Sequence, residues 1–300
     1  SDYPKVTESV EEGGLGFDYK WDMGWMNDTL SYFEKEPWQR SNLYHKITFS
    51  MMYFYNEKFL LPFSHDEVVH GKKTILDKMW GSYEDKFSQA KLLYTYMFTH
   101  PGKKLNFMGN ELGHFREWDE KRELDWNLLE YPMHDSFKRF IDDLNGFYLN
   151  SPVLYKNEYS RKGHKWIQAD DTEKCVYVYE RIYGDEKIVI FLNTYCYNYE
   201  NYSVKFDDSV QLELILNTDW QKYGGKSEEV PELIDSIDLY HQDAGHLYSR
   251  NTYSPHGDVK YTTLENPKHL SKKEMAGAGK NYQVSISLPA YSAKVYKVIG

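Results

Sequence analysis

Cysteine is scarce in this sequence, with only Cys175 and Cys196 among 300 residues. Two residues so placed provide no framework of disulfide bridges, no metal-ligand spacing and no redox pair. This usage is typical of a protein from a reducing compartment, and we expect a cytoplasmic location.

Long apolar runs and an excess of basic charge are also missing. No stretch approaches the length that a membrane span requires, and the formal net charge is −10. Nucleic acids are bound mainly through basic side chains that neutralise phosphates, so this charge argues against such a partner. The sequence predicts a soluble globular protein with neither a membrane nor a nucleic acid as partner, long enough for one large domain or two ordinary ones.

Aromatic residues, in contrast, are abundant at 17%, with 28 Tyr and 8 Trp. Their flat apolar faces and polar edges suit the rings of sugars. Because aromatic side chains also fill cores and strands, composition alone indicates no more than a neutral ligand such as a carbohydrate.

The first half of the chain repeats one pattern three times: a short apolar strand, a polar or glycine-bearing turn, and a helix. The expected strands are residues 16–21, 59–63 and 104–108. Such βα units imply parallel strands. Three units cannot close a barrel of eight, which takes about 250 residues. Either the sheet is small and open, or further units lie outside this chain.

Three helices are expected after these strands. The second starts at Ser82, whose spacing to Asp85 resembles a capping box, and stops before His100. The first and third follow from apolar residues that recur every three or four positions and bury one face against the sheet. These residues are Ile47, Met51, Phe54 and Tyr55 in the first helix, and Phe137, Phe140, Ile141, Leu144, Phe147 and Tyr148 in the third.

Beyond Pro152 the pattern changes to short strands separated by Asn, Asp and Gly turns. This texture predicts an antiparallel sandwich packed behind an α/β domain, with the domains at residues 1–155 and 156–300. Residues 233–280 fit neither pattern and are interpreted as an irregular insertion. The expected strands are residues 174–180, 187–193, 202–206, 212–217 and 281–288, the last with strict alternation of apolar and polar residues.

The most informative stretch is residues 61–72, which reads Leu-Pro-Phe-Ser-His-Asp-Glu-Val-Val-His-Gly-Lys. An apolar run ends there at a cluster of titratable residues, and barrel and open-sheet enzymes place their chemistry at such strand ends. His65 and Asp66 are therefore candidate catalytic residues. The alternative is a buried hydrogen-bonded pair that only orders the loop.

Two other functional interpretations fail on spacing. His65 and His70 are five residues apart, which does not match the His pair of a zinc-protease helix, and no third ligand is indicated. The glycines at positions 13, 14 and 16 precede the expected strand, whereas a phosphate-binding loop follows one. We therefore expect neither a metal nor a cofactor.

Five segments follow one another at spacings typical of a known family. They are residues 14–30, beginning Gly-Leu-Gly-Phe-Asp-Tyr-Lys-Trp, residues 63–73, Phe-Ser-His-Asp-Glu-Val-Val-His-Gly-Lys-Lys, residues 101–111, beginning Pro-Gly-Lys-Lys-Leu, residues 116–118, Arg-Glu-Trp, and residues 124–132, Leu-Asp-Trp-Asn-Leu-Leu-Glu-Tyr-Pro. Together they resemble the C-terminal portion of bacterial 1,4-α-glucan (glycogen) branching enzymes of the α-amylase superfamily, glycoside hydrolase family 13. The resemblance covers residues 1 to 155 closely and the β-rich region more loosely.

This resemblance implies strands six to eight of a (β/α)8 TIM barrel, followed by an antiparallel β-sandwich domain. It also implies a transglycosylase that cleaves α-1,4-glucan and re-forms α-1,6 branch points by a retaining double displacement, acting on glycogen or amylose. Two alternatives stay open. One is another hydrolase of the α-amylase superfamily, and the other is a non-catalytic glucan-binding chain with an open three-stranded core.

The resemblance assigns Asp66 as the third catalytic carboxylate, which stabilises the transition state. It assigns the neighbouring His65 as a contact to a sugar hydroxyl. The nucleophilic Asp and the acid/base Glu of the family have no counterpart here. The chain is therefore expected to be inactive alone and to need the N-terminal half of the same enzyme as its partner. Expected substrate-binding residues are Tyr19, Lys20, Trp21, Trp25 and Glu111, with Trp21 favoured over Trp25 and with packing as the alternative for each aromatic ring.

Overall fold

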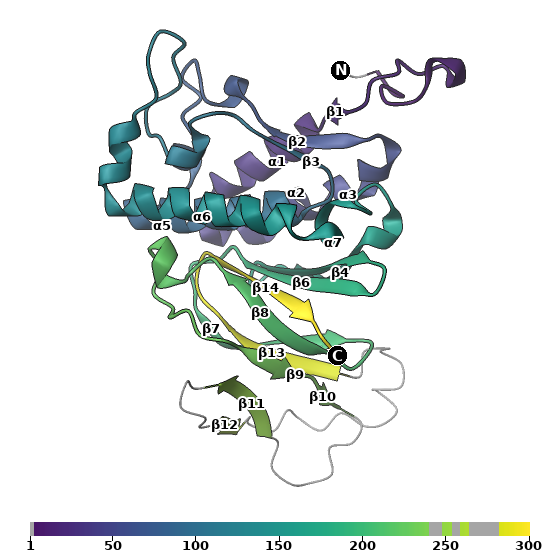
Figure 1. The fold of residues 1–300 in the computed structure, drawn as a ribbon, viewed down its shortest axis with the longest axis vertical. Helices are drawn as coiled ribbons and strands as arrows, with labels where there is room; N and C mark the ends of the chain where they lie inside the picture. The colour runs from purple at the N-terminus through teal and green to yellow at the C-terminus, as the bar shows by residue number, and fades with distance from the viewer. Residues whose placement is uncertain (1–2, 240–247, 254–258, 264–281) are drawn as a thin grey trace.

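The computed structural model describes residues 3–239, 248–253, 259–263 and 282–300. A unit of short parallel strands and helices lies above a β-sandwich in Figure 1, and helices α5 and α6 lie between the two. None of the helices in these ranges is long and apolar enough to cross a membrane.

Three parallel strands within residues 3–239 form one sheet in the order β1 (Lys20–Trp21), β2 (Phe59–Phe63) and β3 (Lys103–Asn106). This confirms the expected parallel pairing, but β1 is much shorter than predicted. The reason lies in the preceding residues, because the amides of Leu15 and Phe17 donate to the carbonyls of Lys5 and Val6 and do not enter a strand ladder.

The helices are α1 (Met23–Phe33), α2 (His45–Thr48), α3 (Ser50–Tyr53), α4 (Ile75–Lys78), α5 (Tyr83–Thr99), α6 (Pro132–Leu149) and α7 (Pro152–Tyr155). The predicted capping box is present at the start of α5, where Ser82 and Asp85 bond to each other's backbone N–H groups. The stripe predicted on α6 is also confirmed at its centre, where Phe137, Phe140 and Leu144 are buried.

The single helix predicted around residues 47–55 is wrong. The chain forms α2, α3 and the 3₁₀ turn η3 (Phe54–Asn56) there, because the Met52 amide bonds to the Phe49 carbonyl three residues back and interrupts the α-helical ladder. The further 3₁₀ turns of the described ranges are η1 (Val10–Glu12), η2 (Pro37–Leu43), η4 (His65–Glu67), η5 (Asn110–Leu112), η6 (Trp126–Glu130), η7 (Arg161–Gly163) and η8 (Gln221–Tyr223).

The sandwich consists of antiparallel sheets, as the sequence predicts. In the described part of the chain, a six-stranded sheet of order β4-β5-β6-β14-β8-β9 faces a three-stranded sheet of order β10-β13-β7, and a hairpin β11-β12 lies beside them. Side chains such as Val178, Phe191, Val204 and Ile286 pack together between the two sheets. The bounds are β4 (His164–Asp171), β5 (Val176–Tyr183), β6 (Glu186–Asn193), β7 (Tyr199–Phe206), β8 (Gln211–Asn217), β9 (Leu233–Asp235), β10 (Ile237–Asp238), β11 (Tyr248–Tyr253), β12 (Val259–Thr263), β13 (Tyr282–Leu288) and β14 (Ser292–Val298).

The insertion predicted at residues 233–280 contains β9 to β12 where it is described. Residues 240–247, 254–258 and 264–280 of this segment lie outside the described residues. The interpretation of this segment as an irregular insertion stays a prediction.

Two buried arginines connect the helices to the sandwich. Arg181 on β5 donates to the carbonyls of Gly163, Leu154 and Thr99 at 2.9, 3.0 and 2.6 Å, and Arg40 donates to those of Lys35, Phe33 and Thr194 at 3.0, 3.0 and 2.6 Å. Several of these carbonyls belong to the last turns of α1, α5 and α7, where a helix leaves its carbonyls unpaired and favours positive charge. The arginines therefore fix the helical layer on the sandwich.

Candidate active site

The predicted catalytic pair lies at the carboxyl end of the central strand. β2 ends at Phe63, and His65 and Asp66 follow in the turn η4, with His65 Nε2 3.2 Å from Asp66 Oδ1. Their side chains are 50% and 57% exposed. The alternative of a buried pair therefore does not describe them, because both groups are open to a ligand from solvent.

The rings beside His65 come from the chain that follows β3. His65 lies 5.7 Å from the ring of Phe107 and 6.5 Å from that of Trp118, and the Phe107 amide donates to the Phe63 carbonyl at 2.9 Å. The ends of β2 and β3 thus meet, as adjacent parallel strands require. His65 and Asp66 therefore lie where the loop after β2 meets the loop after β3.

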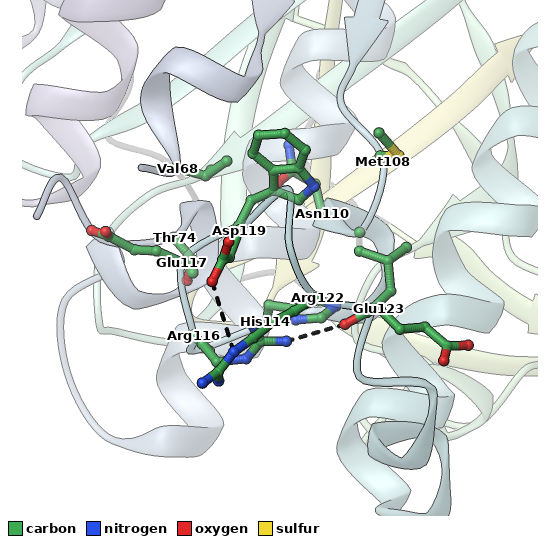
Figure 2. A pocket seen from close by; sticks show the side chains of 13 residues that line it. Val68, Thr74, Met108, Asn110, His114, Arg116, Glu117, Asp119, Arg122 and Glu123 are labelled. Atoms are coloured by element: carbon green, nitrogen blue, oxygen red, sulfur yellow. Dashed lines mark hydrogen bonds and ion pairs between the residues drawn. The ribbon is translucent and has the colours of Figure 1, made fainter. Parts of the chain in front are cut away.

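A pocket lies between these two loops, with about 340 Å³ of space that is partly open to solvent. Figure 2 shows the charged side chains around it, including Arg122 beside Asp119 and Arg116 beside the Glu123 carbonyl. His65 and Asp66 do not line it. The lining residues are Val68, Thr74, Met108, Gly109, Asn110, His114, Arg116, Glu117, Trp118, Asp119, Arg122, Glu123 and Leu124.

Two of the lining residues, His114 and Arg116, share the carboxylate of Asp125, which is not itself part of the lining. Arg116 donates two hydrogen bonds to Asp125, at 3.0 and 2.7 Å, and these bonds lower the pKa of that carboxyl. His114 Nδ1 lies 3.4 Å from the same carboxylate, and burial lowers the pKa of His114, which favours the neutral imidazole. The side chains of Arg116, Asp125 and His114 are thus held in place by their interactions with one another.

Glu117 connects the two loops directly. Its carboxylate accepts hydrogen bonds from the amides of Gly71 and Lys73, which lower its pKa, and the Trp118 amide donates to the Val68 carbonyl at 3.0 Å. Sequence reasoning missed this residue, since a run of charges from residue 116 onwards most simply indicates a solvated face. Its place within the Arg-Glu-Trp segment was the available signal.

Tyr19, Lys20 and Trp21 lie elsewhere on the sheet. Lys20 and Trp21 are in β1 opposite Phe59 and Leu60, the first residues of β2, so about 10 to 13 Å of strand separates these partners from Phe63. Tyr19 and Trp21 are 41% and 40% exposed, and Lys20 Nζ binds Glu57 at 3.3 Å and the Tyr3 carbonyl at 2.9 Å. The structure does not bring these three residues together with Asp66.

Trp25 is a core residue. Only 1% of its surface is exposed, and its ring lies 5.4 Å from that of Phe63 and 5.9 Å from that of Tyr96. The physical reason is that α1 begins at Met23, directly after β1, and therefore packs the face that carries Trp25 against β2. Packing, the alternative stated for this ring, is what the structure favours, and Trp25 is left out of the proposed site.

Glu111 is half-buried in η5 and accepts a hydrogen bond from the Gly109 amide at 2.8 Å. Gly109 has a φ of 91°, a left-handed conformation that is strained for residues with a side chain. Because Glu111 binds the amide of this glycine, it stabilises the turn after β3. In the described ranges, no group of three or more His, Cys, Asp or Glu side chains is arranged to hold a metal ion.

Comparison with known proteins gives three results. Residues 166–247 match the family model described as the α-amylase C-terminal all-β domain. Relatives described as 1,4-alpha-glucan branching enzyme GlgB, from Bacillus cereus strain B4264 and Bacillus anthracis strain CDC 684, are 46% and 44% identical over 249 residues. The match covers 82% of this chain but 38% of each relative, so the chain spans well under half the length of these proteins.

Solved structures resemble the fold. The α-amylase from Geobacillus thermoleovorans, complexed with acarbose, is 15% identical with a TM-score of 0.53, over 100% of this chain and 52% of that one. A debranching enzyme from Nostoc punctiforme is 12% identical with a TM-score of 0.54, over 93% and 48%. At such identities the likeness shows the fold alone, and this chain matches about half of each of these structures.

Proposed function

The chain is a homologue of the bacterial 1,4-α-glucan branching enzymes in the α-amylase superfamily, and on this premise we propose that it forms the C-terminal portion of such an enzyme. In this proposal β1, β2 and β3 are strands six, seven and eight of a (β/α)8 barrel within residues 1–155. Residues 156–300 are the C-terminal β-sandwich domain. The sequential order of the three parallel strands supports the assignment.

The observation that carries the proposal is the position of Asp66. Its carboxylate is exposed at the carboxyl end of the central strand, in a segment that resembles the family's seventh-strand motif. Retaining cleavage of a glycosidic bond passes through an oxocarbenium-like transition state. The Asp66 carboxylate, which accepts hydrogen bonds from two adjacent sugar hydroxyls, stabilises the developing positive charge, while His65 donates a hydrogen bond to a sugar oxygen.

The substrate of the complete enzyme is an α-glucan, glycogen or amylose. An upstream Asp and Glu, outside these 300 residues, serve as nucleophile and acid/base, so that this chain alone does not catalyse branching. The glucosyl ester on the nucleophile is attacked by a C6 hydroxyl of a second glucan, which makes selection of this acceptor over water the defining property. The exposed rings of Tyr19 and Trp21 are proposed to contact glucan, with Lys20 and Glu111 as weaker candidates because both are already hydrogen-bonded.

The experiment is an assay of the complete enzyme on amylose. Because we propose a cytoplasmic location, the assay is run under conditions like those of the cytoplasm. Branching lowers the iodine absorbance of amylose without releasing reducing sugars. Release of reducing sugars in proportion to the absorbance change would contradict the proposal and would show that the enzyme is a hydrolase. Glucan binding without turnover, in a protein whose full gene encodes neither of the other two carboxylates, would replace it with a non-catalytic binding chain.

A further inference from the structure

The loop that carries Asp66, residues 64–74, adopts an unusual backbone. Three of its residues have left-handed conformations, His70 with φ 60°, Gly71 with φ 80° and Lys73 with φ 67°. Only glycine enters this region without a steric cost, so His70 and Lys73 stay there only if other contacts hold them. We call this segment the Asp66 loop.

Glu117 supplies one set of contacts, from outside the loop. Its Oε2 accepts from the Gly71 amide at 2.9 Å and its Oε1 from the Lys73 amide at 2.7 Å. Amides that converge in a turn of this kind form a concave site for an anion. The Glu117 carboxylate fills that site, with one hydrogen bond to each of its oxygens.

Lys78 holds the same loop from the interior. The residue is 7% exposed, and its ammonium donates to the carbonyls of Glu67 and Lys73 at 2.5 and 2.8 Å. The amide and the carbonyl of Lys73 are thus bound by two different residues. Of the two anchors, Lys78 belongs to the helix that follows the loop, whereas Glu117 comes from 46 residues beyond Gly71.

We propose that Glu117 is a positioning residue, which fixes the Asp66 loop through the Gly71 and Lys73 amides and so orients Asp66 without contacting the glucan. This inference rests on the proposed function of Asp66. It is distinct from a binding role, in which loss of the carboxylate would raise KM and leave kcat unchanged. The role also explains why a charged residue on an exposed segment lies against main-chain amides.

The test uses the complete enzyme with three variants. Glu117→Ala removes both acceptors, and Glu117→Gln retains one. Glu120→Ala is the matched control, an exposed carboxylate three residues away on the same segment. Each protein is assayed for kcat and KM of branching and treated with trypsin, which cleaves after Lys72 and Lys73 inside the loop, and its thermal midpoint is recorded.

Glu117→Ala is expected to lower kcat by about 10- to 100-fold, because a small displacement of a catalytic group costs that much, with KM changed by less than about threefold. Cleavage after Lys72 and Lys73 accelerates while the thermal midpoint stays near that of the control. Glu117→Gln falls between the wild type and Glu117→Ala, and it decides the matter if the alanine variant does not fold.

Two results would overturn the inference. A higher KM with unchanged kcat in Glu117→Gln assigns Glu117 to glucan binding. Unchanged kcat and unchanged trypsin cleavage in both variants show that the loop does not depend on it. If the wild type does not branch glucan, the proposed function fails, whereas the cleavage rates still report whether Glu117 holds the loop.

Discussion

Charged side chains gather in two regions of this molecule and are used in opposite ways. Between the helices and the sandwich, Arg40 and Arg181 are fully buried and each donates to three main-chain carbonyls. At the ends of β2 and β3, His65 and Asp66 remain half exposed beside loops held by Glu117. A buried charge whose donors bind acceptors of the protein itself contributes to folding, whereas an exposed charge remains available to a ligand.

The comparison predicts first that changes at Asp66 affect turnover and not stability. In the complete enzyme, Asp66→Asn is expected to lower kcat by about 1000-fold or more, because it removes a charge that stabilises the transition state. Its thermal midpoint should stay within a degree or two of the wild type, about the effect of a neutral surface change. Turnover near the wild-type rate would contradict the assignment of Asp66.

Two tryptophans four residues apart give the sharpest contrast. Trp25→Ala is expected to reduce the free energy of unfolding by about 3–5 kcal/mol, because a large core ring is lost. Trp21→Ala, at a ring that is 40% exposed, is expected to cost under about 1 kcal/mol and to weaken glucan binding instead. Denaturant unfolding and amylose affinity measured on both variants check this pair, and equal stability losses would remove the distinction.

Arg181 tests the other side of the comparison. Arg181→Met is expected to cost about 3 kcal/mol, since it leaves buried carbonyls of Gly163, Leu154 and Thr99 without donors. Arg139→Met is the control, because that side chain is exposed in a surface pair with Asp135. An Arg181 variant as stable as the control would show that the interface does not depend on these hydrogen bonds.

The smallest expected effect is a pH dependence at Lys91. This residue of α5 donates to the Tyr223 carbonyl at 2.7 Å, and burial lowers its pKa from 10.5 to about 8. Between these values the unfolded chain binds the proton and the folded protein does not, so the contribution of Lys91 to stability rises with pH from 8 to 10.5. At and below neutral pH the cost of burying the charged form applies in full.

The measurement compares the wild type with Lys91→Met at pH 7 and pH 10. The stability of the wild type relative to this variant is expected to increase by about 1–3 kcal/mol between the two. Lys121→Met, at an exposed lysine, should show no such change. A difference that is constant with pH would mean that Lys91 keeps its ordinary pKa in the folded protein.

Local patterns predicted the fold where their causes are local. The capping box of Ser82 and Asp85 marked the start of α5, and alternation along β13 correctly predicted buried Val284, Ile286 and Leu288. The resemblance to branching enzymes is also confirmed by the relatives at 46% identity. Helix α1 was missed because its sequence, Met-Gly-Trp-Met-Asn-Asp-Thr at the start, contains several poor helix formers. Packing of Trp25, Leu30 and Phe33 into the core outweighs that preference.

The sequence by itself determined the types of most elements, the antiparallel character of the second half and the position of Asp66 just after a buried strand, because each depends on residues within a few positions of one another. Only the tertiary structure decided that Trp25 is buried, that β1 is two residues long and that Glu117 binds the amides of Gly71 and Lys73. These outcomes depend on which segments meet in space, and contacts across 44 and 46 residues leave no periodic trace in the chain.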